Sequence, residues 1–301
     1  MDLTILGCYS ATPRINTSPT AQVLNIRNHL FLIDCGEGTQ VQLRRYKVKF
    51  SRIRHIFISH LHGDHYFGLI GLISTFMLIG REAELHIYGP KGIKEITLLQ
   101  LKLGKSWIKY PLFFHELESK ESQVIYEDDK VLVETIPLKH RVYTNGFLFK
   151  EKDGDRKLNV VAAKKAKIDM SYYQKIKQGF DVKNEEGVII ANKDITFDPE
   201  KSKSYAFCSD TAYFPECIPL IKNVTALYHE STFLEEHKSM CATTRHSTAK
   251  QAALIAKEAN VGKLILGHYS TRYSSLNKFS EEAKTIFENV NLAEDGKIFV
   301  I

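Results

Sequence analysis

The stretch Ile58–Gly68, "ISHLHGDHYFG", decides the fold because it places four potential metal ligands directly after an apolar run. In an extended segment alternate side chains point the same way, so His60 and His62 can chelate one ion together. Asp64 and His65 fall at the start of the next expected helix and can reach a second ion. A lone histidine is usually structural. Three with an aspartate in six positions are poorly explained by packing, because these side chains are costly to bury unpaired.

The same order, an apolar strand followed by a ligand-type residue, occurs five times along the chain. "RHIFIS" precedes His60, "KVLVETIP" shortly precedes His140, "SYAFCS" precedes Asp210, "VTALY" precedes His229 and Glu230, and "KLILG" precedes His268. In α/β sheets, sites gather at the carboxyl ends of strands. One such coincidence proves nothing, but five favour a shared site.

A two-metal centre accounts for these residues. We expect one ion to be held by His60, His62 and His140, and the other by Asp64, His65 and His268. The two oxygens of Asp210 can bridge ions held roughly 3.5–4 Å apart. Imidazole and carboxylate ligands predict two Zn²⁺ per subunit, with Mn²⁺ or another divalent metal such as iron as the alternative. The remaining histidines are assigned structural or surface roles: His29, His55, His86, His115, His229 and His237.

Length and composition allow a large core, with 301 residues of which 44% are hydrophobic. Strand patterns alternate with helical patterns at 66–79, 93–103, 248–259 and 280–289, which predicts stacked α and β layers. We expect a single domain over 1–301 with an arm inserted at 150–204. From Arg156 to Lys177 there are seven basic residues against one acid, Asp169. This clustering indicates a polyanion contact; the alternative is an ordinary solvated surface.

Nothing in the sequence predicts secretion or membrane insertion. The five cysteines are odd in number, widely spaced and without a CxxC pair, which indicates reduced structural thiols. The N-terminus lacks a basic segment and a long apolar run, so no signal peptide is expected. The longest apolar stretch, about 14 residues, is shorter than the roughly 20 that span a bilayer. We expect a cytoplasmic protein.

The pattern H-x-H-x-D-H after a strand, then a later His, an Asp and a final His, resembles the metallo-β-lactamase superfamily. That resemblance implies an α/β, four-layer αβ/βα sandwich with the metal site at one edge. "HESTF" (229–233), "RHST" (245–248) and "GHYSTRY" (267–273) look like motifs of ribonuclease Z, the tRNA 3′-end processing endoribonuclease. "YYQKIKQG" (172–179) resembles the base of that family's tRNA-gripping arm. The resemblance covers nearly the full chain.

The chemistry of phosphodiester cleavage suggests roles for individual residues. Asp64 can both ligate a metal and accept the proton of the attacking water. A carboxylate raises the pKa of an adjacent imidazole, and the resemblance assigns Glu230 and His246 to protonating the departing oxygen. His246 could instead be a helix N-terminal residue with no chemistry. Arg272 suits a bidentate phosphate contact.

Further substrate contacts rest on the same resemblance. The residues expected to bind RNA, besides Arg272, are Arg14, Tyr172, Tyr173, Lys175 and Lys177. Burial of the two tyrosines against the arm's own helix is the alternative. Two motifs depart from the family pattern. The N-terminal Pro-x-Lys-x-Arg-Asn-type segment is shortened to one with Pro13, Arg14 and Asn16, and Met170-Ser171 stands where the family has Gly-Pro.

The resemblance implies a homodimeric endoribonuclease that removes the 3′ trailer from precursor tRNA and leaves a 3′-hydroxyl. The alternative is a hydrolase of small phosphodiesters or esters on the same dimetal scaffold, against which the basic arm argues. A catalytically silent RNA-binding or scaffold subunit is disfavoured, because all seven expected ligands are present, as are Glu230 and His246.

Overall fold

Two seven-stranded sheets form the centre of the computed structural model, which describes residues 1–12 and 14–301. Pro13 lies outside the described residues. The first sheet runs in the order β18 (Ile298–Val300), β1 (Asp2–Gly7), β2 (Ala21–Ile26), β3 (His29–Ile33), β4 (Ile53–Phe57), β5 (Leu85–Pro90) and β6 (Leu112–Leu117). The second runs β17 (Val290–Leu292), β16 (Leu264–Gly267), β15 (Ala226–Glu230), β14 (Ser204–Cys208), β9 (Asn145–Glu151), β8 (Val131–Pro137) and β7 (Val124–Glu127).

Parallel pairing is what brings distant site residues to one edge. Strands β3 to β6 are mutually parallel, as are β14 to β17. The central strands of the second sheet, β14 to β16, are almost wholly buried, as parallel strands covered on both faces are. The carboxyl ends of the parallel strands therefore point the same way within each sheet.

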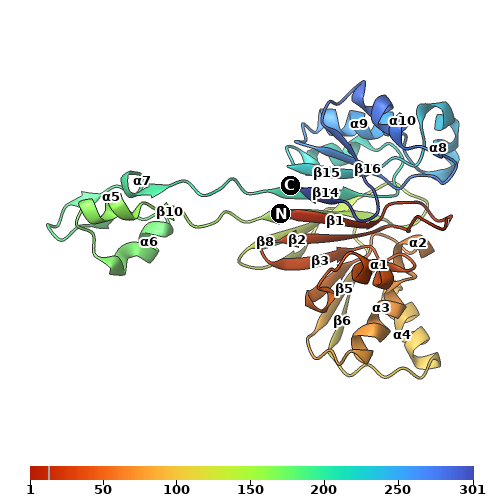
Figure 1. The fold of residues 1–301 in the computed structure, drawn as a ribbon, viewed down its shortest axis with the longest axis horizontal. Helices are drawn as coiled ribbons and strands as arrows, with labels where there is room; N and C mark the ends of the chain where they lie inside the picture. The colour runs from red at the N-terminus through yellow and green to blue at the C-terminus, as the bar shows by residue number, and fades with distance from the viewer. Residues whose placement is uncertain (13) are drawn as a thin grey trace. The chain divides into compact units, whose positions relative to one another are not determined.

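Helices cover the outer faces of both sheets (Figure 1). On the first sheet lie α1 (Thr39–Arg45), η1 (Phe50–Arg52), α2 (Gly63–Tyr66), α3 (Leu69–Leu78) and α4 (Ile93–Leu103). On the second lie η3 (Pro215–Ile221), η4 (Glu235–His237), α8 (Lys238–Thr244), α9 (Ala249–Glu258) and α10 (Asn277–Lys284). Helix α9 starts with a capping box between Thr248 and Gln251, which satisfies its first backbone donors.

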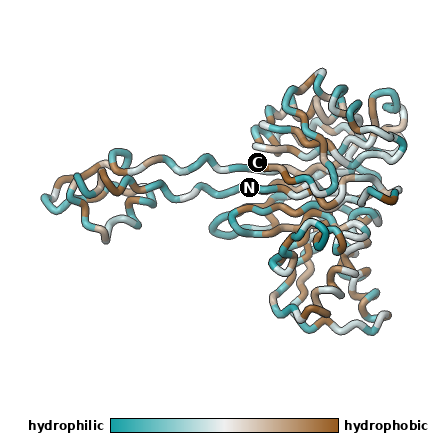
Figure 2. The backbone as a smooth tube through the Cα atoms, in the orientation of Figure 1, coloured by the Kyte–Doolittle hydropathy of each residue, from teal (hydrophilic) through white to brown (hydrophobic). Residues whose placement is uncertain are grey.

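The expected α/β sandwich of stacked layers is confirmed. One apolar core lies between the sheets and continues beneath α9 and α10, and a second joins the first sheet to α1, α3 and α4. Figure 2 shows the apolar residues gathered along the strands of both sheets.

Two predicted helices have different bounds from those expected. The helix expected at 66–79 is broken between α2 and α3. A Cβ at Gly68 would lie 2.1 Å from the carbonyl oxygen of Gly36, so the chain turns here in close contact with that loop. The helix expected at 280–289 is α10, at 277–284. Residues 285–289 then form turns, and the chain pairs as β17 with β16 from Val290.

The chain divides into two compact units. The first comprises Met1–Glu127, Val131–Lys150 and Lys203–Ile301, and contains both large sheets. The second comprises Asp128–Lys130 and Glu151–Ser202, mostly within the range 150–204 assigned to an arm. Its elements are β10 (Lys157–Leu158), α5 (Val160–Lys165), η2 (Met170–Tyr172), α6 (Tyr173–Lys177), β11 (Val182–Lys183), β12 (Ile189–Ile190), α7 (Asn192–Ile195) and β13 (Thr196–Phe197).

The second unit has a small core of its own, built on Ile168, Ile176, Val182 and Ile195.

In the described part of the chain, no helix has the length and apolar character needed to cross a membrane. All five cysteines are free and buried, in agreement with their expected role as structural thiols.

Candidate metal centre

The seven expected ligands come together at one edge of the first unit, where the carboxyl ends of strands from both sheets meet. His60 and His62 follow β4, and Asp64 and His65 lie in the short helix α2. His140, Asp210 and His268 follow β8, β14 and β16 of the second sheet. The structure places these side chains close together. Metal binding by them stays a prediction.

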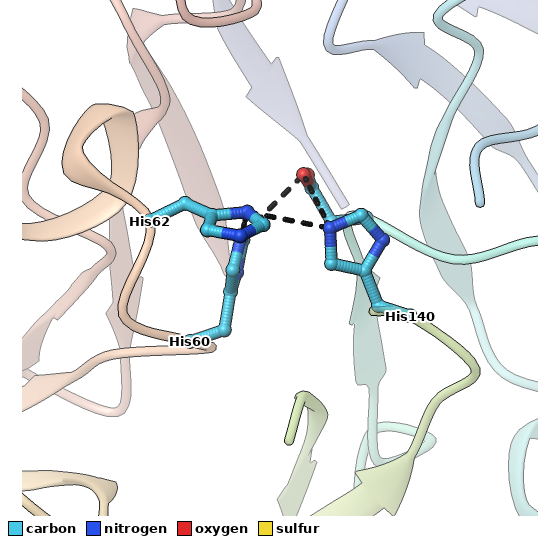
Figure 3. Close-up of side chains that lie close together, drawn as sticks. His60, His62 and His140 are labelled. Atoms are coloured by element: carbon cyan, nitrogen blue, oxygen red, sulfur yellow. Dashed lines mark hydrogen bonds and ion pairs between the residues drawn. The ribbon is translucent and has the colours of Figure 1, made fainter. Parts of the chain in front are cut away.

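The side chains fall into the two sets expected from the sequence. Ligand atoms of His60, His62, His140 and Asp210 lie within 4.8 Å of one another, as do those of Asp64, His65 and His268. Figure 3 shows the imidazoles of His60, His62 and His140 pointing toward one another.

Asp210 lies between the two sets, with one carboxylate oxygen toward each. Its Oδ2 is 3.5 Å from His60 Nε2 and 3.9 Å from His140 Nε2. Its Oδ1 is 3.2 Å from His65 Nε2 and 3.1 Å from His268 Nε2. The distances suit shared ligation, because atoms bound about 2.0–2.1 Å from one tetrahedral ion lie roughly 3.3 Å apart.

The donors fit divalent metals better than they fit a metal-free polar network. His65 Nε2 and His268 Nε2 are buried and lie 3.1–3.5 Å from carboxylate oxygens of Asp64 and Asp210, yet neither forms a well-aligned hydrogen bond with the described residues. Buried polar atoms without well-aligned hydrogen bonds cost stability, whereas a metal ion would use the lone pair of each nitrogen. Burial lowers the pKa of His60 and of His140. Both are therefore neutral, the form that binds metal.

Backbone strain is concentrated at this site. Asp210 and His268 both have φ 58°, in the left-handed region that non-glycine residues seldom adopt. Such conformations cost free energy and persist where the surrounding structure imposes them. Here the turn after each strand points the ligand into the cluster.

Asp34 is a site residue that the sequence analysis missed. It follows β3, is fully buried, and also has a positive φ, 54°. Its Oδ2 lies 2.7 Å from His65 Nδ1 and accepts a 2.9 Å hydrogen bond from Ser59 Oγ. A carboxylate in this position fixes the tautomer and orientation of a ligating histidine. The signal was available, since "HLFLIDCG" is also an apolar strand followed by an acid.

Other ligands are oriented in the same way. His140 Nδ1 lies 3.0 Å from the carbonyl oxygen of Arg245, to which only the protonated nitrogen can donate. His268 Nδ1 lies 2.9 Å from Thr232 Oγ1, which in turn donates to Glu230 Oε2 at 2.7 Å. In both histidines Nε2 is left to face the cluster.

Glu230 and His246 form the pair expected from the sequence. His246 Nδ1 lies 2.8 Å from Glu230 Oε1 and 4.0 Å from Asp210 Oδ2. Burial by itself would lower the pKa of His246, but the Glu230 carboxylate outweighs it and raises the pKa to about 9. The imidazole is therefore protonated at neutral pH.

The expected substrate contacts lie in two different places. Arg272 is exposed, and its guanidinium carbon lies 5.4 Å from the ring centroid of Phe233. The Phe233 ring in turn lies 6.3 Å from the ring of His246, centroid to centroid. Arg14 Nη1 donates to the carbonyl oxygen of Tyr273 at 3.3 Å. Both arginines therefore belong to the segments around the metal edge, and their contacts with RNA stay predictions.

The arm residues lie in the second unit. Tyr172 is 37% exposed, and Lys175 and Lys177 are exposed. Tyr173 instead packs against the small core of that unit, as the alternative interpretation expected for the tyrosines.

Comparison with known proteins decides the family. The chain is 46% identical over 300 residues to a protein named Ribonuclease Z from Bacteroides thetaiotaomicron, covering 100% of this chain and 95% of that protein. A protein of the same name from Cytophaga hutchinsonii is 48% identical over 305 residues, covering 100% and 96%. The chain belongs to the ribonuclease Z family.

Solved structures agree with this membership. The short form of human tRNase Z has a TM-score of 0.73 and 26% identity, covering 100% of this chain and 99% of the other. The metallo-β-lactamase fold protein YhfI from Bacillus subtilis supports the fold alone. It is 19% identical with a TM-score of 0.69, covering 99% of this chain and 98% of the other. A family model described as Anti-Pycsar protein Apyc1 also matches residues 1–289. The expected metallo-β-lactamase fold and ribonuclease Z membership are confirmed.

Proposed function

We propose that this ribonuclease Z removes the 3′ trailer from precursor tRNA by two-metal phosphodiester hydrolysis and leaves a 3′-hydroxyl on the tRNA. The full-length similarity to ribonuclease Z carries the proposal. The site supports it, because ligand sets for two ions lie directly beside a proton-donating imidazole.

Two divalent ions, Zn²⁺ or alternatively Mn²⁺, would activate the attacking water and hold the phosphate oxygens. His60, His62 and His140 would hold one ion, Asp64, His65 and His268 the other, and Asp210 both. Of the two carboxylates in these sets, Asp64 is the more accessible, with a side chain 8% exposed against 3% for Asp210. We assign it to accept the water's proton.

His246 supplies the proton for the departing O3′ of the tRNA. Its Nδ1 is engaged by Glu230, which leaves Nε2 as the nitrogen that donates. Glu230 itself accepts backbone hydrogen bonds from Thr211 and Thr232, so its carboxylate is held in position while the imidazole changes charge. Arg272 and Arg14 are proposed to contact phosphates of the RNA.

The second unit is proposed to bind tRNA. It contains the basic run from Arg156 to Lys177, and its own core lets it present that run as a folded surface. Phosphate contacts by lysine and arginine supply sequence-independent affinity that falls steeply with salt. A small substrate needs no such surface.

Replacing Glu151–Ser202 by a short Gly-Ser linker tests substrate size. For a tRNA enzyme, cleavage of a 3′-extended precursor should collapse while hydrolysis of a nitrophenyl phosphodiester persists. Asp64→Ala in the full chain should abolish both activities. Undiminished cleavage of precursor tRNA by the linker variant would reject the arm's role. If the full-length, metal-loaded enzyme cleaves no precursor tRNA, the small-substrate hydrolase would be favoured instead.

We further propose that the enzyme is a cytoplasmic homodimer. Large apolar side chains are exposed on and just after α3 and α4: Leu78, Ile79, Leu98, Leu99, Leu103 and Trp107. Leu78, Leu103 and Trp107 are each more than 70% exposed. Exposed large apolar side chains concentrated on two helices favour an interaction site, and a second copy of the chain is the occupant we propose.

A further inference from the structure

A cavity lies in the first unit at the opposite end of the first sheet from the metal centre. Its volume is about 570 Å³, within the range of small-ligand sites. It is formed where β3, β4 and β5 begin, whereas the metal ligands follow the strand ends. The lining residues are Asn28, His29, Leu30, Ser51, Arg52, Arg54, His55, Ala83, Glu84 and Tyr126.

The cavity has more positive than negative charge around it. Arg52 and Arg54 line it and are exposed, while Glu84 is the only acidic residue among the lining residues. The Glu84 carboxylate is partly engaged, with Oε1 3.6 Å from His86 Nε2. Arg52 also donates to the carbonyl oxygen of Asn28 at 2.8 Å, which holds one guanidinium beside the opening.

A third arginine fixes the wall of the cavity. The Arg81 side chain donates to the carbonyl oxygens of Ala83 at 2.7 Å, Ser51 at 3.3 Å and Ile53 at 2.9 Å, and also to that of Glu84 at 2.6 Å. These partners are neutral carbonyls, so the positive charge of Arg81 is not cancelled by them. The wall is thereby rigid and adds to an electropositive environment.

Aromatic rings form another side of the cavity. The His55 ring lies 4.6 Å from that of Tyr126 and stacks at 5.1 Å on His86, which stacks at 5.2 Å on His115. Burial, together with the neighbouring histidines, lowers the pKa of His55 to about 3, so its ring is neutral. His55 Nδ1 is buried and has no hydrogen-bond partner among the described residues.

We propose that this cavity is a binding site for a nucleoside monophosphate unit. Arg54 and Arg52 bind the phosphate, for which guanidinium geometry is suited, and the base stacks against the His55–Tyr126 side. The unit comes either from a free nucleotide or from one nucleotide of an RNA strand. Binding of the free nucleotide does not depend on the proposed tRNA cleavage.

The test compares AMP, adenosine and inorganic phosphate by titration calorimetry on the full-length, metal-loaded enzyme. AMP should bind more tightly than either component, because both halves of the cavity are then used. Arg54 has an exposed side chain, so Arg54→Glu should fold normally yet weaken AMP about tenfold or more, the loss expected for a charged hydrogen bond. Arg54→Lys should retain part of the affinity, and Lys222→Glu, an exposed charge reversal in the second-sheet half, should retain all of it.

The metal centre also attracts phosphate, so dependence on Arg54 separates the two sites. If Arg54→Glu binds AMP as tightly as the unmodified enzyme, the proposal is overturned. If Arg54→Glu weakens AMP and also raises the KM for precursor tRNA at unchanged kcat, the site takes a nucleotide of the RNA. If it weakens AMP while both cleavage parameters stay unchanged, the site takes a free nucleotide.

Discussion

The Glu230–His246 pair predicts a specific change in the pH dependence of cleavage. Glu230→Gln keeps the shape of the side chain but only one of its two oxygens, so it keeps an acceptor for the backbone N–H of either Thr211, bound at Oε1, or Thr232, bound at Oε2. It removes the negative charge 2.8 Å from His246 Nδ1. Because His246 must be protonated to donate, wild-type cleavage should hold up to about pH 9 and decline above it. In the variant the decline should begin at lower pH.

The size of the effect follows from the pKa of His246, which is raised from 6.5 to about 9. At about 1.4 kcal/mol per pKa unit, this is on the order of 3 kcal/mol in favour of the imidazolium. Without the Glu230 carboxylate, burial and His65 lower the pKa while Asp210 raises it, so the pKa should return toward its ordinary value of 6.5. At pH 8.5 about 1% of the variant would then be protonated, so cleavage should fall roughly 50–100-fold, within the range for general acid catalysis.

The assay is a pH profile of single-turnover cleavage of precursor tRNA, run alongside a nitrophenyl phosphodiester. Nitrophenolate departs without protonation, so its release should be almost unaffected. Glu258→Gln, at the exposed end of α9, is the matched control. Equal losses on both substrates, or an alkaline limb in the variant that stays near pH 9, would refute the proton-donor role and leave Glu230 as a structural residue.

Four further predictions concern the metals and the assembly. Asp34→Asn removes the carboxylate that orients His65 and should weaken binding at that ion's site about 10–100-fold in chelator competition, leaving the other ion in place. Metal analysis should find about two ions per chain in the wild type and far fewer in Asp210→Ala, because Asp210 faces both ligand sets. Chelation should lower the thermal unfolding midpoint of the wild type, since the ions bind only the folded state. Leu103→Glu, on the apolar surface of α4 and 73% exposed, should shift sedimentation from dimer to monomer; an unchanged dimer would place the interface elsewhere.

Local sequence determined the ligand types and the secondary structure that presents them. An apolar run followed by His, Asp or Glu is readable from adjacent residues, and each expected strand is present. Spacing also placed His60 and His62 in one set and Asp64 and His65 in the other. Helix ends were less predictable, as at Gly68, where contact with the Gly36 backbone breaks the helix.

Only the tertiary structure decided which distant residues meet. The contacts between Asp34 and His65, and between Thr232 and His268, cross strands that are paired in space but separated in sequence. The cavity beside Arg54 likewise needs the start of three strands and β7 to be brought together. Strand order and register depend on burial summed over the whole core, and no short motif encodes that sum. The sequence therefore specified the chemistry of the metal centre, and the fold supplied the residues that orient it.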